Sequence, residues 1–436
     1  MMTLFNHFVQ QVDLYYSKQI RFFIGFSGGL DSTVLVSLFS ELQKIRPHIQ
    51  IKVIHIHHGL SPNADNWAFH CQQVCHNLGL PFEVQRVQVN SKAGLEAGAR
   101  EARYQAIKEH LPPTAIFVTA HHLQDQTETF FLALKRGSGL QGLGAMQPQS
   151  TVFNVPVFRP LLPFSRQQLL EYANKCNLTW IEDESNQNNY YDRNFLRNEI
   201  LPLLRQRWSH FDQSVQRSAQ HCIEQQQLIN ELLATEFQQR FNKNDRTFDV
   251  NGFTPQAKTK QNFLLRQWIA QFNLTMPSVI QLEHINRDVI FADSDRNPTY
   301  YLAPYTIRRY QQTLYLTKPF ADLRQIRLEI KLDQRITLPD QLGYIKLRKS
   351  EPHFIASWTQ VNHQQIEHKL PITNQPIEIR FTYAGKVRSK TGINQDIKKC
   401  WQQHKIPPWQ RQRTPLVFYG NTFIAALGLF EQYITI

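Results

Sequence analysis

Long apolar runs are missing from this sequence. No stretch approaches the roughly 18 consecutive apolar residues of a membrane-spanning helix, and the opening MMTLFNHF lacks the basic-then-apolar plan of a signal peptide. Cysteine is also scarce, since the five cysteines are scattered, odd in number and never arranged as Cys-x-x-Cys. These absences argue against a membrane protein, a disulfide framework and a structural zinc site, and they predict a reduced, cytoplasmic protein.

Acidic residues are outnumbered by basic ones. The chain carries 48 Lys and Arg against 35 Asp and Glu, which gives a formal net charge of +13. Such an excess predicts attraction to a polyanion such as nucleic acid. An anionic membrane surface and simple solubility are the alternatives. The membrane alternative is the weaker one, because neither end of the chain forms a basic amphipathic helix.

The nucleotide loop Gly-x-x-x-x-Gly-Lys-Ser/Thr is absent, but another glycine-rich turn is present. It joins an apolar run, 21–26, to an amphipathic stretch that begins at its last serine. Adjacent glycines let the backbone approach a ligand, and the helix start offers unpaired N–H groups to phosphates. An acid beside phosphates is tolerable if a divalent cation lies between them. An ordinary strand-to-helix turn is the alternative. The predicted nucleotide loop consists of Ser27, Gly28, Gly29, Leu30, Asp31 and Ser32.

The first two hundred residues alternate strand-like and helix-like patterns. Regular alternation with short links predicts an α/β domain with a parallel sheet covered by helices on both faces. Ligands of such sheets bind at the carboxyl ends of the strands, where 27–32 falls. The expected strands are 22–26, 51–56, 82–89 and 115–119, and the expected helices are 32–46, 63–78, 95–109, 123–135 and 166–177.

The pattern changes further along the chain. Helical stretches are expected at 213–243, 261–272 and 277–291, which predicts a helical middle domain. Short strand-like runs punctuated by prolines follow Pro319, at 326–332, 343–347, 377–382 and 422–427. We therefore predict three domains: an α/β domain (1–212), a helical domain (213–318) and a small mixed α/β domain (319–436).

Further polar residues stand at predicted strand ends and helix starts. His121 ends the fourth strand, and Asp125 and Glu128 share one face of the helix that follows. Asp31 and Asp125 then end two strands of one sheet, which predicts a metal–nucleotide site. Arg100 and Arg103 share a helical face and could clamp phosphates, although a solvated surface is an equal alternative.

Basic residues suggest contacts with nucleic acid. Gly137-Ser-Gly-Leu-Gln-Gly142 matches the dinucleotide fingerprint, but it follows a helix instead of a strand, so we interpret it as a loop preceded by Arg136. Residues 378–413 hold nine Lys and Arg against two acids, with aromatics between them, a pattern typical of phosphate contact with base stacking. A solubilising surface is the alternative. The candidates are Arg136, Arg193, Arg197, Lys398, Lys399, Arg411 and Arg413; for Arg193 and Arg197, salt-bridged structural roles are equally open.

These motifs together resemble the tRNA(Ile)-lysidine synthetase family of N-type ATP pyrophosphatases, also called PP-loop or adenine nucleotide α-hydrolase-like proteins. The resemblance spans the chain and rests on the segments in their order: SGGLDS, HHGL, LEAGARxARY, TAHHLQDQTET, KRGSGLQGL, RPLL, WIEDESNQNNYYDRNFLRNEILP and KKCWQQHKIPPWQRQRTPLVFYGNTFIAALGLF. SGGxDS alone marks only the wider ATP class.

The resemblance implies a reaction. The family adenylates C2 of the wobble cytidine in the CAU anticodon of an isoleucine tRNA, and L-lysine then displaces AMP to give lysidine, which changes codon reading from AUG to AUA. It implies that 27–32 hold ATP, that Asp31 and Asp125 serve Mg²⁺ and the phosphates, and that Arg100, Arg103, His121 and Glu128 lie near the substrates. It also implies that the domain 1–212 is catalytic and that the domains 213–318 and 319–436 contact tRNA. The resemblance leaves open whether the protein forms a homodimer. The rival interpretations are a tRNA thiolase, a small-molecule ligase and a non-catalytic RNA-binding protein.

Overall fold

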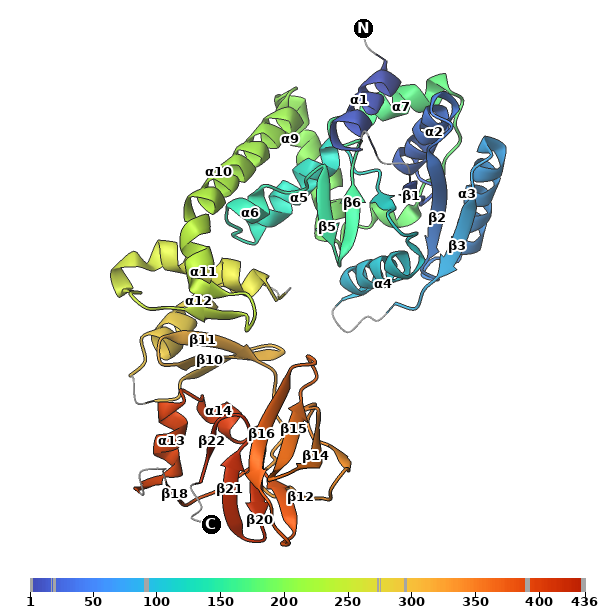
Figure 1. The fold of residues 1–436 in the computed structure, drawn as a ribbon. Helices are drawn as coiled ribbons and strands as arrows, with labels where there is room; N and C mark the ends of the chain where they lie inside the picture. Colours follow the sequence, from blue (N-terminus) through green and yellow to red (C-terminus); the bar gives the residue numbers. More distant parts are fainter. Residues whose placement is uncertain are drawn as a thin grey trace. The chain divides into compact units, whose positions relative to one another are not determined.

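The computed structural model describes residues 3–16, 18, 21–89, 94–272, 274, 276–293, 296–388 and 393–432. The chain folds as two compact units, Met1–Leu232 and Leu233–Ile436 (Figure 1). Among the described residues, no helix has the length and apolar character that crossing a membrane requires.

The first unit is built on a six-stranded sheet. Its strand order is β3-β2-β1-β4-β6-β5, and every neighbouring pair is parallel except β5 with β6. The predicted parallel sheet is therefore confirmed, with an antiparallel edge that the sequence analysis missed. The strands are β1 (Arg21–Gly25), β2 (Gln50–His57), β3 (Phe82–Arg86), β4 (Ile116–Val118), β5 (Gln149–Val152) and β6 (Val155–Phe158).

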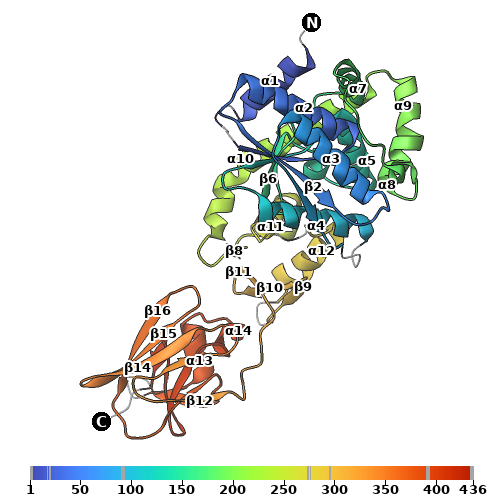
Figure 2. The same ribbon diagram turned by 90° about the vertical axis from the view of Figure 1, so that its right-hand side faces the viewer.

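Helices cover both faces of this sheet, as predicted (Figure 2). Side chains alternate along β1, so Phe22 and Ile24 pack into one buried cluster with Leu35 of α2, while Phe23 packs into another with Ile107 of α4. The helices are α1 (Leu4–Tyr16), α2 (Leu30–Ile45), α3 (Ala64–Leu78), α4 (Leu95–His110), α5 (Leu123–Lys135), α6 (Leu140–Leu143), α7 (Arg166–Lys175), α8 (Asp192–Phe195) and α9 (Leu201–Arg207), with a 3₁₀ turn at Glu184–Gln187 and a π turn at Leu196–Ile200.

A 30-residue helix, α10 (Phe211–Arg240), leads out of the first unit into the second. The helices predicted here are confirmed as α10, α11 (Lys258–Ala270) and α12 (Val279–His284), the last continued by a π turn (Ile285–Ile290). A 3₁₀ turn lies at Pro255–Ala257. The region is not only helical, however. It also holds a five-stranded sheet that the sequence analysis missed, ordered β7-β8-β11-β10-β9. Its strands are β7 (Phe241–Asn242), β8 (Thr247–Asp249), β9 (Thr299–Leu302), β10 (Tyr305–Tyr310) and β11 (Thr313–Thr317).

In its described residues, the C-terminal part contains two larger sheets, a two-stranded sheet and two short helices, in agreement with the predicted mixed α/β domain. One sheet is ordered β12-β17-β20-β21-β22 and the other β13-β14-β15-β16, with a separate β18-β19 pair. Ile345, Trp358 and Phe381 are buried in one core formed by both sheets. The division at residues 212 and 318 stays a proposal. The elements are β12 (Arg327–Ile330), β13 (Arg335–Thr337), β14 (Tyr344–Ser350), β15 (His353–Thr359), β16 (Gln365–Pro371), β17 (Ile377–Arg380), β18 (Lys386–Arg388), β19 (Asn394–Asp396), α13 (Ile397–Gln403), α14 (Pro408–Arg411), β20 (Leu416–Tyr419), β21 (Thr422–Ala426) and β22 (Phe430–Glu431).

Candidate active site

The candidate active site lies where the strand order of the first sheet reverses. Strands β1 and β4 are parallel neighbours, although three helices and two strands separate them in sequence. Connections leave them to opposite sides, and such a switch point is where parallel sheets bind ligands. The loop 27–32 follows β1, and residues 119–125 follow β4. Both predicted acids, Asp31 and Asp125, are thereby brought to the same crevice.

The loop after β1 has the backbone shape of a phosphate cradle. Gly28 has a φ of +89°, a conformation that favours glycine, and a Cβ there would lie 2.8 Å from Ile181 Cδ1. The Ile181 N–H donates to the Gly28 carbonyl at 2.9 Å and fixes the loop against the chain that follows α7. Helix α2 begins at Leu30 and has no side-chain cap at Gly29. Its first N–H groups therefore remain available to an anion.

The two loop serines bond to each other. Ser27 Oγ lies 3.0 Å from Ser32 Oγ, and the Ser32 hydroxyl also bonds to the Gly29 carbonyl at 3.0 Å. The Ser27 N–H donates to Ser32 Oγ at 3.3 Å. These contacts hold the loop in shape, so the cradle does not depend on a ligand to organise it.

His122 links the two acids, and the sequence analysis missed it. Its Nε2 lies 3.5 Å from Asp31 Oδ2 and 3.5 Å from Asp125 Oδ2. Its Nδ1 accepts the Gln124 N–H, while Asp125 accepts the His122 N–H, so the pair forms a capping box at the start of α5. Burial lowers the pKa of His122, but Asp125 and Asp31 outweigh burial and raise this pKa. The sequence did carry a signal for this arrangement: His122 directly precedes the predicted helix, and the acid Asp125 follows three positions later.

Glu128 is buried and held by two arginines. Its carboxylate is 1% exposed, and it pairs with Arg197 Nε at 2.7 Å and Arg193 Nε at 3.0 Å. Arg197 also reaches Asp125 Oδ1 at 3.2 Å. Burial lowers the pKa of Arg197, but the bond to Glu128 outweighs it and leaves this pKa raised. Of the two meanings that the sequence left open for Arg193 and Arg197, the structure provides the ion-pair one; a contact with nucleic acid stays a prediction.

His121 lies beside this cluster without joining its ion pairs. Its Nδ1 is 2.8 Å from the Thr119 hydroxyl. Burial lowers the pKa of His121 to about 3, and Arg159 and Arg193 add to this effect. Burial raises the pKa of Asp125, but His122 and Arg193 outweigh burial and hold that pKa below its usual value. His121 is therefore a neutral neighbour of an ionised Asp125.

Arg100 and Arg103 lie on helix α4 and have exposed side chains. The Arg100 guanidinium lies 5.2 Å from the centre of the Tyr104 ring, and Arg103 Nη2 lies 3.5 Å from His58 Nε2. No contact within the described ranges joins either arginine to Asp31 or Asp125. Their predicted role at the phosphates remains untested.

The acids of the crevice can hold a magnesium ion only if a bound nucleotide supplies further oxygen ligands. Asp31 Oδ1 is buried and has no hydrogen-bond partner among the described residues, as expected of an oxygen that awaits a cation. In the described part of the chain, no group of three or more His, Cys, Asp or Glu forms a metal cage. Mg²⁺ commonly needs only one or two carboxylates when phosphates supply further oxygens. The residues present therefore fit a metal that arrives with a nucleotide.

Three family models match the chain: a PP-loop domain over 2–204, a TilS substrate binding domain over 248–315 and a TilS substrate C-terminal domain over 377–432. A tRNA(Ile)-lysidine synthase of Histophilus somni (strain 129Pt) is 55% identical over 418 residues, covering 96% of this chain and 97% of the relative. This chain belongs to the tRNA(Ile)-lysidine synthase family. Another member, from Actinobacillus succinogenes, is 47% identical and covers 99% of this chain and 100% of the relative.

The similarity to solved structures is much looser. The U34-tRNA thiolase NcsA from Methanococcus maripaludis matches with a TM-score of 0.41 and 15% identity, over 50% of this chain and 78% of that chain. Family membership therefore rests on the sequence relatives. This family membership confirms the resemblance found in the motifs. The first unit therefore contains the ATP-using PP-loop domain of the family.

The basic residues predicted to meet tRNA fall into two groups in this family member. Lys398 and Lys399 are exposed on α13, and Arg136 is exposed at the end of α5. Arg411 instead donates to the Ile406 carbonyl at 3.0 Å, and Arg413 pairs with Asp340 and lies 4.4 Å from the Phe320 ring centre. The exposed lysines are free to approach a phosphate, whereas the two arginines already stabilise the fold.

Proposed function

We propose that this chain ligates L-lysine to C2 of the wobble cytidine in the CAU anticodon of tRNA(Ile), through an adenylated cytidine. The cytidine O2 attacks the α-phosphate of ATP and pyrophosphate leaves. The ε-amine of lysine then attacks C2, AMP leaves with the former O2, and the amine loses a proton. The product reads AUA instead of AUG.

The β1–β4 crevice is the observation that carries this proposal. Adenylation of the cytidine requires in-line positioning of the reacting groups and positive potential around the phosphates more than it requires a covalent nucleophile. The uncapped start of α2 and the backbone of 27–32 supply N–H donors for the leaving pyrophosphate. Cys71 and Cys75 are buried, and burial raises the pKa of both thiols, so neither suits a thiolase.

Asp31 and Asp125 would hold Mg²⁺ in this proposal. The cation supplies charge neutralisation for the triphosphate, a role that the carboxylates cannot perform alone. His122 keeps the two carboxylates together before the nucleotide arrives, and Glu128 fixes Arg193 and Arg197 beside them. Arg100, Arg103 and His121 are proposed to lie next to the substrates. We also propose that the protein is cytoplasmic and can form a homodimer.

The wobble base must leave its stack to reach the crevice. The exposed Lys398 and Lys399, with Arg136, would hold tRNA phosphates elsewhere on the substrate. The net charge of +13 supports this attraction to a polyanion. The tRNA partner thus accounts for a second unit that an ATP site alone does not need.

A labelling experiment tests the proposal. The protein is incubated with ATP, Mg²⁺, labelled lysine and bulk tRNA, and label in tRNA is measured together with AMP and pyrophosphate. Label that enters tRNA with stoichiometric AMP supports the proposal. Sulfur transfer, a labelled small molecule or tRNA binding without AMP release would favour the thiolase, the small-molecule ligase or the non-catalytic binder instead.

A further inference from the structure

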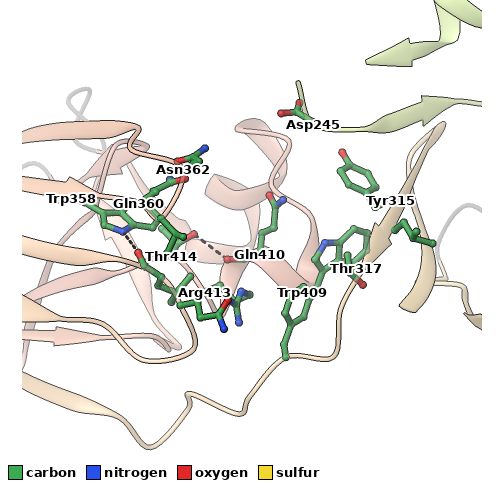
Figure 3. A pocket seen from close by; sticks show the side chains of 15 residues that line it. Asp245, Tyr315, Thr317, Trp358, Gln360, Asn362, Trp409, Gln410, Arg413 and Thr414 are labelled. Carbon is green, nitrogen blue, oxygen red and sulfur yellow. Dashed lines mark hydrogen bonds between the residues drawn. The ribbon is translucent and has the colours of Figure 1, made fainter. Parts of the chain in front are cut away.

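The second unit contains a hollow that the reaction at the first sheet does not use. It has a volume of about 520 Å³ and is lined from β11, the strand β15 with the turn after it, and α14. Figure 3 shows Trp409 and Tyr315 on one side, with Trp358, Gln360 and Asn362 on the other. This volume lies in the usual range for small-ligand sites.

Aromatic side chains give the hollow a flat wall. The Trp409 ring lies 5.2 Å from Tyr315 at an interplanar angle of 71°, and Arg308 lies 5.5 Å from the same indole. These neighbours hold Trp409 in one orientation. Its Nε1–H is buried and has no hydrogen-bond partner among the described residues. Water cannot reach this N–H, so Trp409 offers the hollow its ring and not a donor.

Side-chain amides complete the lining. In Figure 3 Gln410 points into the space between the two sides, and Gln360 borders it from the opposite sheet. Within the described part of the chain, neither side-chain amide makes a hydrogen bond. Each amide offers a donor beside an acceptor, which is the pattern that pairs with the edge of a base.

The charges around the hollow disfavour an anion. Only Asp245 and Arg413 are charged among the lining residues. Arg413 is paired with Asp340, and Asp245 accepts from the Asn242 amide at 3.2 Å. Neither lining residue therefore offers a phosphate an unpaired cation. The Arg308 guanidinium, which does not line the hollow, donates to the Thr317 hydroxyl and lies against the Trp409 ring. A planar, uncharged ligand with polar edges suits these walls better.

From this geometry we propose that the hollow binds one unpaired, unstacked base of the substrate tRNA outside the anticodon. Single-stranded RNA bases are recognised in this way, by stacking on aromatics and by hydrogen bonds to their edges. Trp409 supplies the stacking face, and Gln360 and Gln410 read the edge. This inference rests on tRNA being the substrate, and it adds a second point of recognition.

The test compares the Gln360→Ala/Gln410→Ala double variant with the wild-type full chain. Both amides are unbonded in the fold, so the variant is expected to keep its thermal stability. The KM for tRNA should rise roughly 5- to 100-fold, as for a lost base contact, while kcat and the KM for ATP and lysine stay unchanged. The salt dependence of tRNA binding should also stay unchanged, because no phosphate contact is lost. Gln325→Ala, an exposed glutamine of the same unit, is the matched control.

Chemical probing of base edges gives a second readout. In the wild-type complex one unpaired base outside the anticodon loop should be protected, and the double variant should restore its reactivity. Trp409→Phe keeps a smaller stacking face, so we expect a KM between those of the wild type and the double variant. If the wild type and the double variant show the same protection pattern and the same KM, the proposal that the hollow binds a base is wrong. A protected base without lysine incorporation would instead overturn the proposed function and leave the pocket standing.

Discussion

The crevice between β1 and β4 and the surface of helix α13 hold charged residues in opposite ways. In the crevice, Glu128 is buried and two arginines are fixed against it, whereas Lys398 and Lys399 project from α13 with exposed side chains. Removing a partner from a buried cluster leaves an uncompensated charge, but removing an exposed lysine changes only the local potential. We therefore expect the activity of the crevice to depend on geometry, and the proposed tRNA contact on α13 to depend on the number of charges.

The largest expected effect comes from Asp31→Ala in the crevice. The carboxylate would hold the cation that neutralises the triphosphate, so we expect ATP-dependent adenylation to fall by at least roughly 10²- to 10³-fold, with tRNA binding unchanged. AMP and pyrophosphate release in the presence of tRNA measures the first quantity, and filter binding measures the second. Asp13→Ala, which removes an exposed ion pair with Arg46 in the same unit, is the control. Normal turnover by Asp31→Ala would contradict the assignment.

Glu128→Gln should act on stability as well as on activity. The variant removes the carboxylate that Arg193 and Arg197 share. Because both arginines are about a third exposed and Arg197 keeps its contact with Asp125, we expect the first unit to lose about 1 to 2 kcal/mol of unfolding free energy. The urea-unfolding transition of the first unit gives this free energy for the wild type and for the variant. Glu101→Gln, on the exposed side of α4, should leave the transition in place. A shift no larger than that of the control would mean that the ion pairs contribute little.

Much of the catalytic half was predictable, because its evidence is local in sequence. A glycine-rich turn after an apolar run and a helix start at Leu123 place Asp31 and Asp125 at strand ends, and parallel strands bring such ends together. The bridge by His122 and the burial of Glu128 under two arginines were not predictable. They depend on how residues far apart in sequence pack, since Arg197 lies 69 positions from Glu128 and His122 lies still further from Asp31. The strands β9 to β11 were missed, because only β10 alternates clearly between buried and less buried residues.

On α13, Lys398→Ala/Lys399→Ala should weaken tRNA binding and lower its salt dependence. Each phosphate contact contributes about 0.7 to 0.9 to the slope of log K against log salt, so the double variant should lose roughly one to two units. Binding constants at several salt concentrations give the slope. Arg413→Ala is the informative comparison, since Arg413 is paired with Asp340 and packed on Phe320. We expect this variant to lower the stability of the second unit and to leave the slope in place. Equal slopes for wild type and the double lysine variant would remove α13 from the tRNA surface.

The smallest expected effect concerns His58, which follows strand β2 in the first unit. Burial lowers the pKa of His58 to about 4, and Arg103 adds to this effect. An unfolded histidine titrates near 6.5, so between pH 6.5 and 4 the unfolded chain binds a proton that the folded chain does not bind, and stability falls as the pH falls. His58→Gln removes this term. The variant should therefore lose about 1 kcal/mol less than the wild type between pH 6.5 and 5, as measured by denaturant unfolding at each pH. The exposed His48→Gln should keep the wild-type slope, and a His58→Gln curve parallel to that of the wild type would show that the folded state does not hold His58 neutral.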